Sequence, residues 1–233
     1  MNGYYHNISE FIEVLNGCGI PYVILRNHEN LHLSELFMAG HEDIDLLTAD
    51  SRALAAHIGA MSFSDKVKEV CNDGVHYYVM IGDRTVSLDI RCIGDGYYCA
   101  QWQRDMLERR VRENGVCVMD KQDYFYSLLY HCLLQKRSLS VDAKARLKKM
   151  AAELNLTVDD DSIRGLVHLL EDYMKRHHYT YTYPTDIFVP LRKKYIDRSL
   201  LQNDSSLAFR HWKFDCKVSF VEFLVRIKHI LAF

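Results

Sequence analysis

The chain has 233 residues, of which 48 % are hydrophobic and 26 % are charged, and it contains three prolines. This composition is typical of a folded globular protein with a sizeable core, and no repeat or low-complexity segment interrupts it. Its apolar runs are shorter than the roughly 20 residues that span a bilayer, so we expect no transmembrane segment.

The formal net charge of −2 is the balance of two unequal parts. Residues 1–100 carry 6 Lys+Arg against 14 Asp+Glu, whereas the remaining residues carry 23 against 17. An acidic part suits divalent cations and a basic part suits phosphates. Uneven surface charge that serves solubility is the alternative explanation.

Seven cysteines occur without any C-x-x-C pair. Their odd number and scattered positions favour free thiols in a reducing cytoplasm over a zinc site or a disulfide framework. The first residues, MNGYYHNISEF, lack a basic region followed by an apolar one, so we expect no secretory signal and a cytoplasmic location.

The first half alternates predicted helices and strands. Asn7 and Glu10 fit a capping box at the start of a helix that Gly17 and Gly19 would end. Residues 21–25 and 44–48 predict short buried strands, and residues 50–60 predict a helix. Residues 66–93 predict a meander of three strands with turns at 72–74 and 82–83.

The second half is predicted to be helical. The expected helices cover residues 94–111, 120–137, a basic segment opened by Ser140, 158–177 and 220–233. We therefore expect an α+β protein, with an α/β domain at residues 1–119 and a helical domain at residues 120–233.

Two acids mark the start of the second strand. Asp43 and Asp45 flank Ile44, so strand alternation places both carboxylates on one face. Two such charges repel each other unless a cation lies between them, and Mg²⁺ prefers oxygen ligands. Asp89 lies on the polar face of a later strand, and if the two strands are neighbours the three acids could hold a pair of metal ions. An Asp-x-Asp pair that merely caps a strand end is the alternative.

The segments YVILRN, EDIDLL and SLDIR, in this order among helices, resemble the nucleotidyltransferase superfamily with its DNA polymerase beta type of fold. The likeness is greatest to poorly characterised bacterial branches and covers about residues 8–137. It implies a mixed sheet with flanking helices and Mg²⁺ or Mn²⁺ ions held by Asp43 and Asp45, with Asp89 completing the catalytic site. The implied reaction transfers a nucleoside monophosphate from a nucleoside triphosphate such as ATP to a hydroxyl or phosphate acceptor.

The sequence departs from that superfamily at the end of the first strand. Most members have a Gly-Ser pair there, where this chain has Arg26-Asn27. Arg26 could bind phosphate as a charged fork, and Asn27 could supply a neutral donor. The same change equally fits weak nucleotide binding, a different phosphate donor, or a catalytically silent binding or scaffolding module.

Other residues leave alternatives open. Arg91 could reach a phosphate or form a salt bridge with one of the acids, while His131 is favoured as a hydrogen-bonded core residue. Asp123 and Glu108 are candidate general bases that no spacing singles out. The last helix, residues 220–233, could pack on the domain, lie on an anionic membrane or form a dimer contact.

The expected acceptor is a small molecule such as a sugar or sugar phosphate, and less readily a protein hydroxyl. Long nucleic acid is not expected, because the sequence indicates no extended basic groove.

Overall fold

The computed structural model of the chain describes residues 3–31, 43–62, 74–136, 139–158 and 160–231, with side chains up to residue 220. The predicted strand at residues 66–71 and most of the turn at 72–74 lie outside these residues. All six cysteines in the described part are free thiols, as predicted. No helix in the described ranges is long and apolar enough to cross a membrane.

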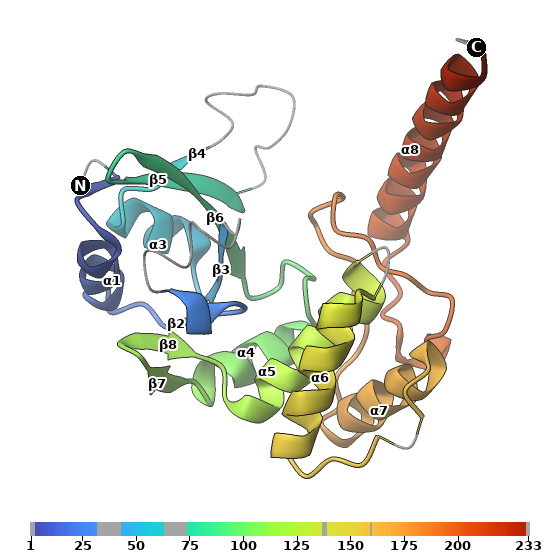
Figure 1. The fold of residues 1–233 in the computed structure, drawn as a ribbon, viewed down its shortest axis with the longest axis horizontal. Helices are drawn as coiled ribbons and strands as arrows, with labels where there is room; N and C mark the ends of the chain where they lie inside the picture. The colour runs from blue at the N-terminus through green and yellow to red at the C-terminus, as the bar shows by residue number, and fades with distance from the viewer. Residues whose placement is uncertain (1–2, 32–42, 63–73, 137–138, 159, 232–233) are drawn as a thin grey trace.

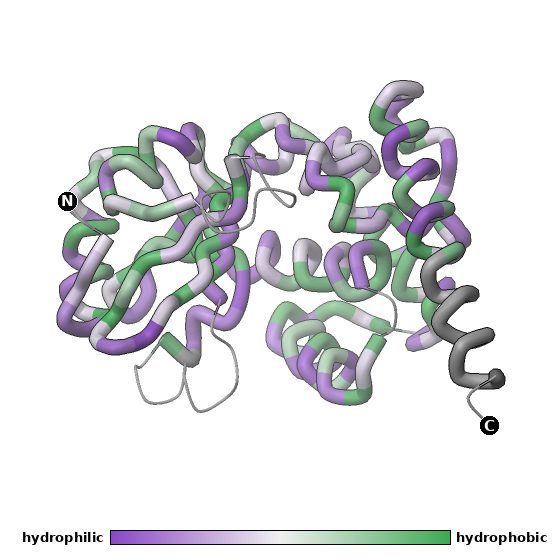
Figure 2. The backbone as a smooth tube through the Cα atoms, turned by 90° about the horizontal axis from the view of Figure 1, so that it is seen from above, coloured by the Kyte–Doolittle hydropathy of each residue, from purple (hydrophilic) through white to green (hydrophobic). Residues whose placement is uncertain are grey.

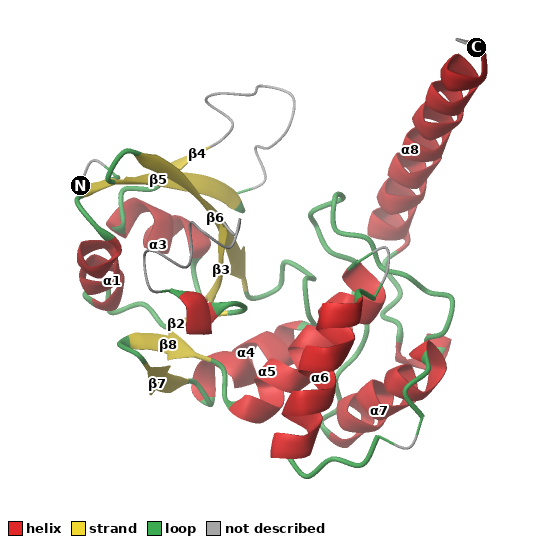
Figure 3. Ribbon diagram, viewed as in Figure 1, coloured by secondary structure: helices red, strands yellow, loops and turns green. Residues whose placement is uncertain are grey.

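The described strands form one mixed sheet in the order β1-β5-β6-β3-β2-β8-β7, with β4 paired to β5 (Figures 1 and 3). The strands are β1 (Tyr4–Tyr5), β2 (Tyr22–Ile24), β3 (Asp43–Thr48), β4 (Met61–Ser62), β5 (His76–Ile81), β6 (Arg84–Cys92), β7 (Val111–Glu113) and β8 (Val116–Val118). At the centre of the sheet, β3 runs parallel to β6 and antiparallel to β2. The fold class is α+β, as the sequence predicts.

The central strands are buried on both faces, which explains their nearly continuous apolar sequences. One face, with Ile44 and Leu46, packs against α1 (Ile8–Asn16) and α3 (Ser51–His57). The other face, with Val23 and Leu47, packs into the larger apolar cluster of the helical part. A single sheet therefore joins two cores.

Side-chain caps begin most of the helices, at the predicted positions except for the helix expected from residue 158, which begins after Ser162. The Oδ1 atom of Asn7 accepts from the backbone N–H of Glu10 at 3.0 Å, and Asp50, Asp120, Ser140 and Ser162 cap later helices in the same way. The later helices are α4 (Ala100–Glu108), α5 (Lys121–Tyr130), α6 (Val141–Glu153), α7 (Ile163–Arg176) and α8 (Ser205–Leu231). The last of them extends away from the body of the molecule (Figures 1 and 2).

Three further predictions of element boundaries are wrong. The helix predicted to run to residue 111 ends at Glu108, and residues 111–118 form the β7–β8 hairpin, in which Asn114 and Gly115 adopt positive φ angles that suit a tight turn. The helix predicted at 120–137 ends at Tyr130 and continues as a π-helical turn, η3 (His131–Gln135). The last helix begins at Ser205, well before residue 220.

The division at residue 119 stays a prediction. Among the described residues, every strand of the sheet precedes it. However, the larger apolar cluster contains Val23 and Leu47 together with Phe125 of α5, Leu147 of α6 and Leu170 of α7. The helical part therefore shares a core with the sheet.

The segment that follows α7 returns to the sheet at a tight backbone contact. Gly96 has φ +74, and a Cβ atom placed there would lie 2.2 Å from the carbonyl oxygen of Tyr183. Thr182 Oγ1 donates to the Gly96 carbonyl at 2.9 Å, and the backbone N–H of Thr185 donates to the Asp95 carbonyl at 2.7 Å. This contact brings Asp186 to the end of β6.

Candidate functional site

Strand register brings Asp45 and Asp89 together. In the parallel pair formed by β3 and β6, Asp45 is the register partner of Asp89, and Asp43 is the partner of Ser87. Neighbouring strands lie about 4.8 Å apart, so two acids in register on the same face are close. The two acidic strands are therefore neighbours, which was the condition for the acids to converge.

Arg26 compensates the first of these carboxylates. It follows β2, which runs antiparallel to β3, and its Nη2 atom lies 2.6 Å from Oδ2 of Asp45. Both side chains are largely buried, and burial alone would lower the pKa of Arg26. The charge of Asp45, together with contributions from Tyr97 and Tyr98, nevertheless holds the Arg26 pKa well above its ordinary value.

Arg91 compensates the charge of Asp89 and also pairs with a further carboxylate, that of Asp186. Its Nη2 atom lies 3.2 Å from Oδ2 of Asp89, and its Nη1 atom lies 2.9 Å from Oδ2 of Asp186. His76 Nε2 is 3.7 Å from an oxygen of each of these acids. Of the two alternatives for Arg91, the structure has the salt bridge, and at 3 % exposure the guanidinium is not open to a phosphate.

Tyr97 lies between the two arginines. Its ring centroid is 4.5 Å from Cζ of Arg91 and 5.7 Å from Cζ of Arg26, distances typical of cation–π contacts. The hydroxyl accepts from Nη1 of Arg26 at 2.7 Å. Tyr97 thus holds both guanidinium groups in place from the side of the helical core.

The π-helical turn supplies two more side chains to this layer. His131 Nδ1 lies 3.2 Å from the Tyr97 hydroxyl and 3.0 Å from Oε1 of Gln135, and Gln135 Nε2 donates to the Tyr97 carbonyl at 2.9 Å. Burial and the charge of Arg26 lower the pKa of His131 to about 2, so its ring is neutral. Such π-helical turns are frequent at functional sites.

The side chain of Asn27 contacts Arg146 of α6, whereas its neighbour Arg26 contacts Asp45. Asn27 adopts a left-handed backbone with φ 59, and its Oδ1 accepts from Nη1 of Arg146 at 3.1 Å. Arg146 also forms an ion pair with Glu29 at 2.9 Å. Glu29 and Arg146 line a cleft of about 310 Å³, and His28, Glu113, Tyr124 and Lys149 also line it.

Asp43, Asp45, Asp89 and Asp186 lie with Arg26 and Arg91 at the face of β3 and β6 that is turned toward the helical part, a cluster that we call the acidic edge. Its net charge suits a divalent cation. Asp43, Asp45, Asp89 and Asp186 outnumber Arg26 and Arg91 by two charges. Burial raises the pKa of Asp89 and the nearby charge of Asp45 adds to the rise, although Arg91 opposes it. Oxygen ligands and a deficit of two positive charges suit Mg²⁺ or Mn²⁺ by chemistry.

The carboxylates are of the right chemical type for a divalent cation, but their positions do not form a complete set of metal ligands. Asp43 is exposed at the start of β3, and Asp45 is engaged with Arg26. Within the described residues, no group of three His, Cys, Asp or Glu side chains is arranged to hold a metal ion. Metal binding would therefore require Asp45 to share its carboxylate with Arg26.

Asp123, a candidate general base, lies in a buried hydrogen-bond network of the helical core. It is fully buried and accepts hydrogen bonds from Trp102 Nε1 at 2.9 Å and from the Tyr173 hydroxyl at 2.8 Å. Arg109 makes two further contacts with its carboxylate, each of 2.9 Å. Glu108, at the end of α4, is not among the residues gathered at the acidic edge.

The sequence singled out Arg26, Asp43, Asp45, Asp89 and Arg91, and the structure brings these five to one edge. It missed three partners, namely His76, Tyr97 and Asp186. A signal existed for Tyr97, which follows a glycine turn after the Asp89 strand. No spacing indicates Asp186, since it arrives from a segment about a hundred residues away.

Comparisons of the chain with family models, with curated proteins and with solved structures found no match.

Replacement of Asp186 by Asn is expected to lower the free energy of unfolding by roughly 3 kcal/mol. The buried Arg91 guanidinium then loses its partner at 2.9 Å and keeps only the more exposed Asp89 at 3.2 Å. Urea denaturation measures this change. The control is Asp161→Asn, which breaks the exposed Lys144–Asp161 ion pair and is expected to cost about 0.5 kcal/mol. Equal effects of the two substitutions would contradict the compensating role of Asp186.

The neutral state of His131 predicts a pH dependence of stability. The folded chain keeps the His131 pKa near 2, whereas the ordinary value is 6.5, so below pH 6.5 only the unfolded chain takes up this proton. The free energy of unfolding therefore decreases as the pH is lowered below 6.5, by at most about 1.4 kcal/mol per pH unit. His131→Gln removes this contribution, so between pH 7.5 and 5.5 the variant should gain about 1 kcal/mol relative to the wild type. Parallel stability curves would refute the prediction.

Proposed function

We propose that the chain is a Mg²⁺-dependent nucleotidyltransferase that moves a nucleoside monophosphate from a nucleoside triphosphate to a small acceptor. The observation that carries the proposal is the register of Asp45 with Asp89 on neighbouring parallel strands. Asp43 precedes this pair on the same strand, and Arg26 follows the antiparallel strand beside it.

In this proposal Asp45 and Asp89 are the principal metal ligands, and Asp43 is the third carboxylate. A bound Mg²⁺ ion would neutralise charge on the leaving pyrophosphate and favour deprotonation of the acceptor hydroxyl. Arg26 remains next to the bound nucleotide as a charged donor to a phosphate oxygen, once Asp45 shares its carboxylate with the metal. Arg91 keeps Asp89 in position and makes no phosphate contact.

The cleft beside Asn27 is the proposed acceptor site. It is formed by Glu29, Arg146 and residues of α5 and α6, so the helical part would supply it. Its mixture of carboxylates, cations and the Tyr124 ring suits a hydroxylated molecule such as a sugar or sugar phosphate, which forms many hydrogen bonds and stacks on aromatic rings. A protein hydroxyl is the less favoured acceptor.

A catalytically silent binding module is the second candidate. One observation favours it: the ion pair between Arg26 and Asp45 already neutralises a carboxylate that catalysis would need for metal. In such a module the fold would serve a partner surface, and neither nucleotide nor Mg²⁺ would bind at the acidic edge.

Thermal denaturation with Mg²⁺ and a panel of nucleoside triphosphates tests the enzyme proposal. The wild type should gain several degrees in Tm only when metal and nucleotide are both present. Asp43→Asn should lose this gain and keep the Tm of the free protein, because Asp43 is exposed. Asp83→Asn, in the exposed turn between β5 and β6, is the matched control and should retain the full gain.

Product formation distinguishes the two candidates. Labelled nucleoside triphosphate, Mg²⁺ and a mixture of small metabolites should give a labelled product with the wild type and with Asp83→Asn, and none with Asp43→Asn. The absence of both a Tm gain and a labelled product in the wild type would favour the silent module.

A further inference from the structure

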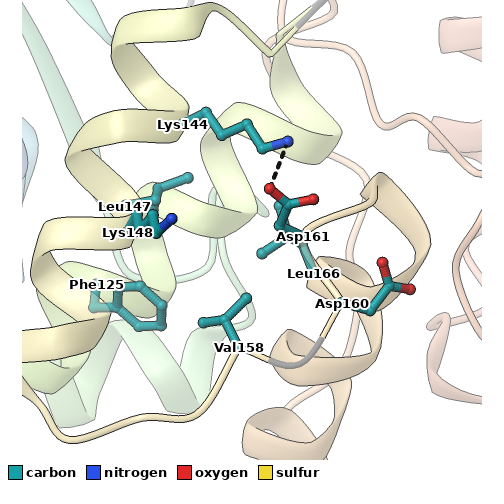
Figure 4. A pocket seen from close by; sticks show the side chains of 8 residues that line it. All are labelled: Phe125, Lys144, Leu147, Lys148, Val158, Asp160, Asp161 and Leu166. Carbon is teal, nitrogen blue, oxygen red and sulfur yellow. Dashed lines mark ion pairs between the residues drawn. The ribbon is translucent and has the colours of Figure 1, made fainter.

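A cavity in the helical part is separate from the acidic edge. It has a volume of about 270 Å³ and lies between α6 and the start of α7, with Phe125 of α5 in its wall (Figure 4). None of its lining residues belongs to the acidic edge. It is small compared with typical ligand pockets of roughly 300–1,000 Å³.

The inner surface of this cavity is apolar. Phe125, Leu147 and Leu166 are almost fully buried, and Val158 completes the surface from the loop before α7 (Figure 4). Aliphatic and aromatic walls favour an apolar ligand, since such a ligand gains dispersion contacts and leaves water on entry.

The loop side of the rim is rigidly held. Asp160 accepts from the backbone N–H and the hydroxyl of Ser162, both at 2.8 Å. A Cβ atom at Gly165 would lie 2.3 Å from the Asp160 carbonyl oxygen, so only glycine permits this close approach of the loop to α7. The Asp160 carboxylate is thereby engaged by Ser162, the N-cap residue of α7.

The helix side of the rim carries two lysines one turn apart. Lys144 pairs with Asp161 at 2.9 Å, as the dashed line in Figure 4 marks. Lys148 forms no ion pair or hydrogen bond within the described part of the chain. Lys148 therefore offers an ammonium group beside an apolar cavity, an arrangement complementary to an amphipathic anion.

We propose that this cavity binds a small aliphatic carboxylate, with its chain among Phe125, Leu147 and Leu166 and its carboxylate on Lys148. The exposed ion pair between Lys144 and Asp161 stands at the mouth. Such exposed pairs contribute only about 0–1 kcal/mol, so the pair can open to admit the chain at small cost.

Titration of the ¹⁵N-labelled protein with octanoate below its micellar concentration tests the proposal by NMR. Saturable shifts should be confined to the neighbourhood of Phe125, Leu147 and Leu166. Octylamine, with the same chain and the opposite charge, should bind at least fivefold more weakly, which corresponds to about 1 kcal/mol.

Three variants define the site. Lys148→Met should weaken octanoate binding about fivefold, whereas Lys213→Met at an exposed position of α8 should leave it unchanged. Val158→Trp should fill the cavity and abolish binding, with Val158→Phe as the smaller replacement if the tryptophan disturbs the spectrum. Unsaturable shifts, equal binding of octylamine, or unchanged binding in both cavity-filling variants would overturn the proposal.

Discussion

The in-register placement of Asp45 and Asp89 on adjacent parallel strands is the constraint on which the site depends. Two carboxylates this close repel each other in a buried environment unless positive charge accompanies them. Arg26, after the end of β2, and Arg91, near the end of β6, supply this positive charge, and each lies within 3.2 Å of one acid. Asp186 adds a second carboxylate partner to Arg91, so that the four acids exceed the two arginines by two negative charges.

This arrangement ties the helical part of the chain to the sheet. Tyr97 contacts both guanidinium groups, and its backbone and hydroxyl are held by the π-helical turn that follows α5. Asp186 reaches the same edge because Gly96 lets the segment after α7 approach its backbone closely. The acidic edge is therefore built from both the sheet and the helical part.

Local sequence signals were sufficient for much of the sheet and for the acids. Alternation in TVSLDIRCI and the apolar run after Asp43 place two strands correctly, and the caps at Asn7, Asp120 and Ser140 mark helix starts. The partners of the acids could not be predicted in this way. Asp186 depends on a close approach of two distant backbones, and the π-helical turn at His131 depends on packing rather than on periodicity, because all of Asp123–Tyr130 is buried.

The central claim is that the acidic edge accepts a divalent cation despite its two arginines. Anomalous X-ray scattering from crystals grown with Mn²⁺ and a non-hydrolysable nucleoside triphosphate tests it most directly. A Mn²⁺ peak is expected about 2 Å from carboxylate oxygens of both Asp45 and Asp89. A structure with bound nucleotide elsewhere, no Mn²⁺ at these acids and an unchanged Arg26–Asp45 ion pair would contradict it.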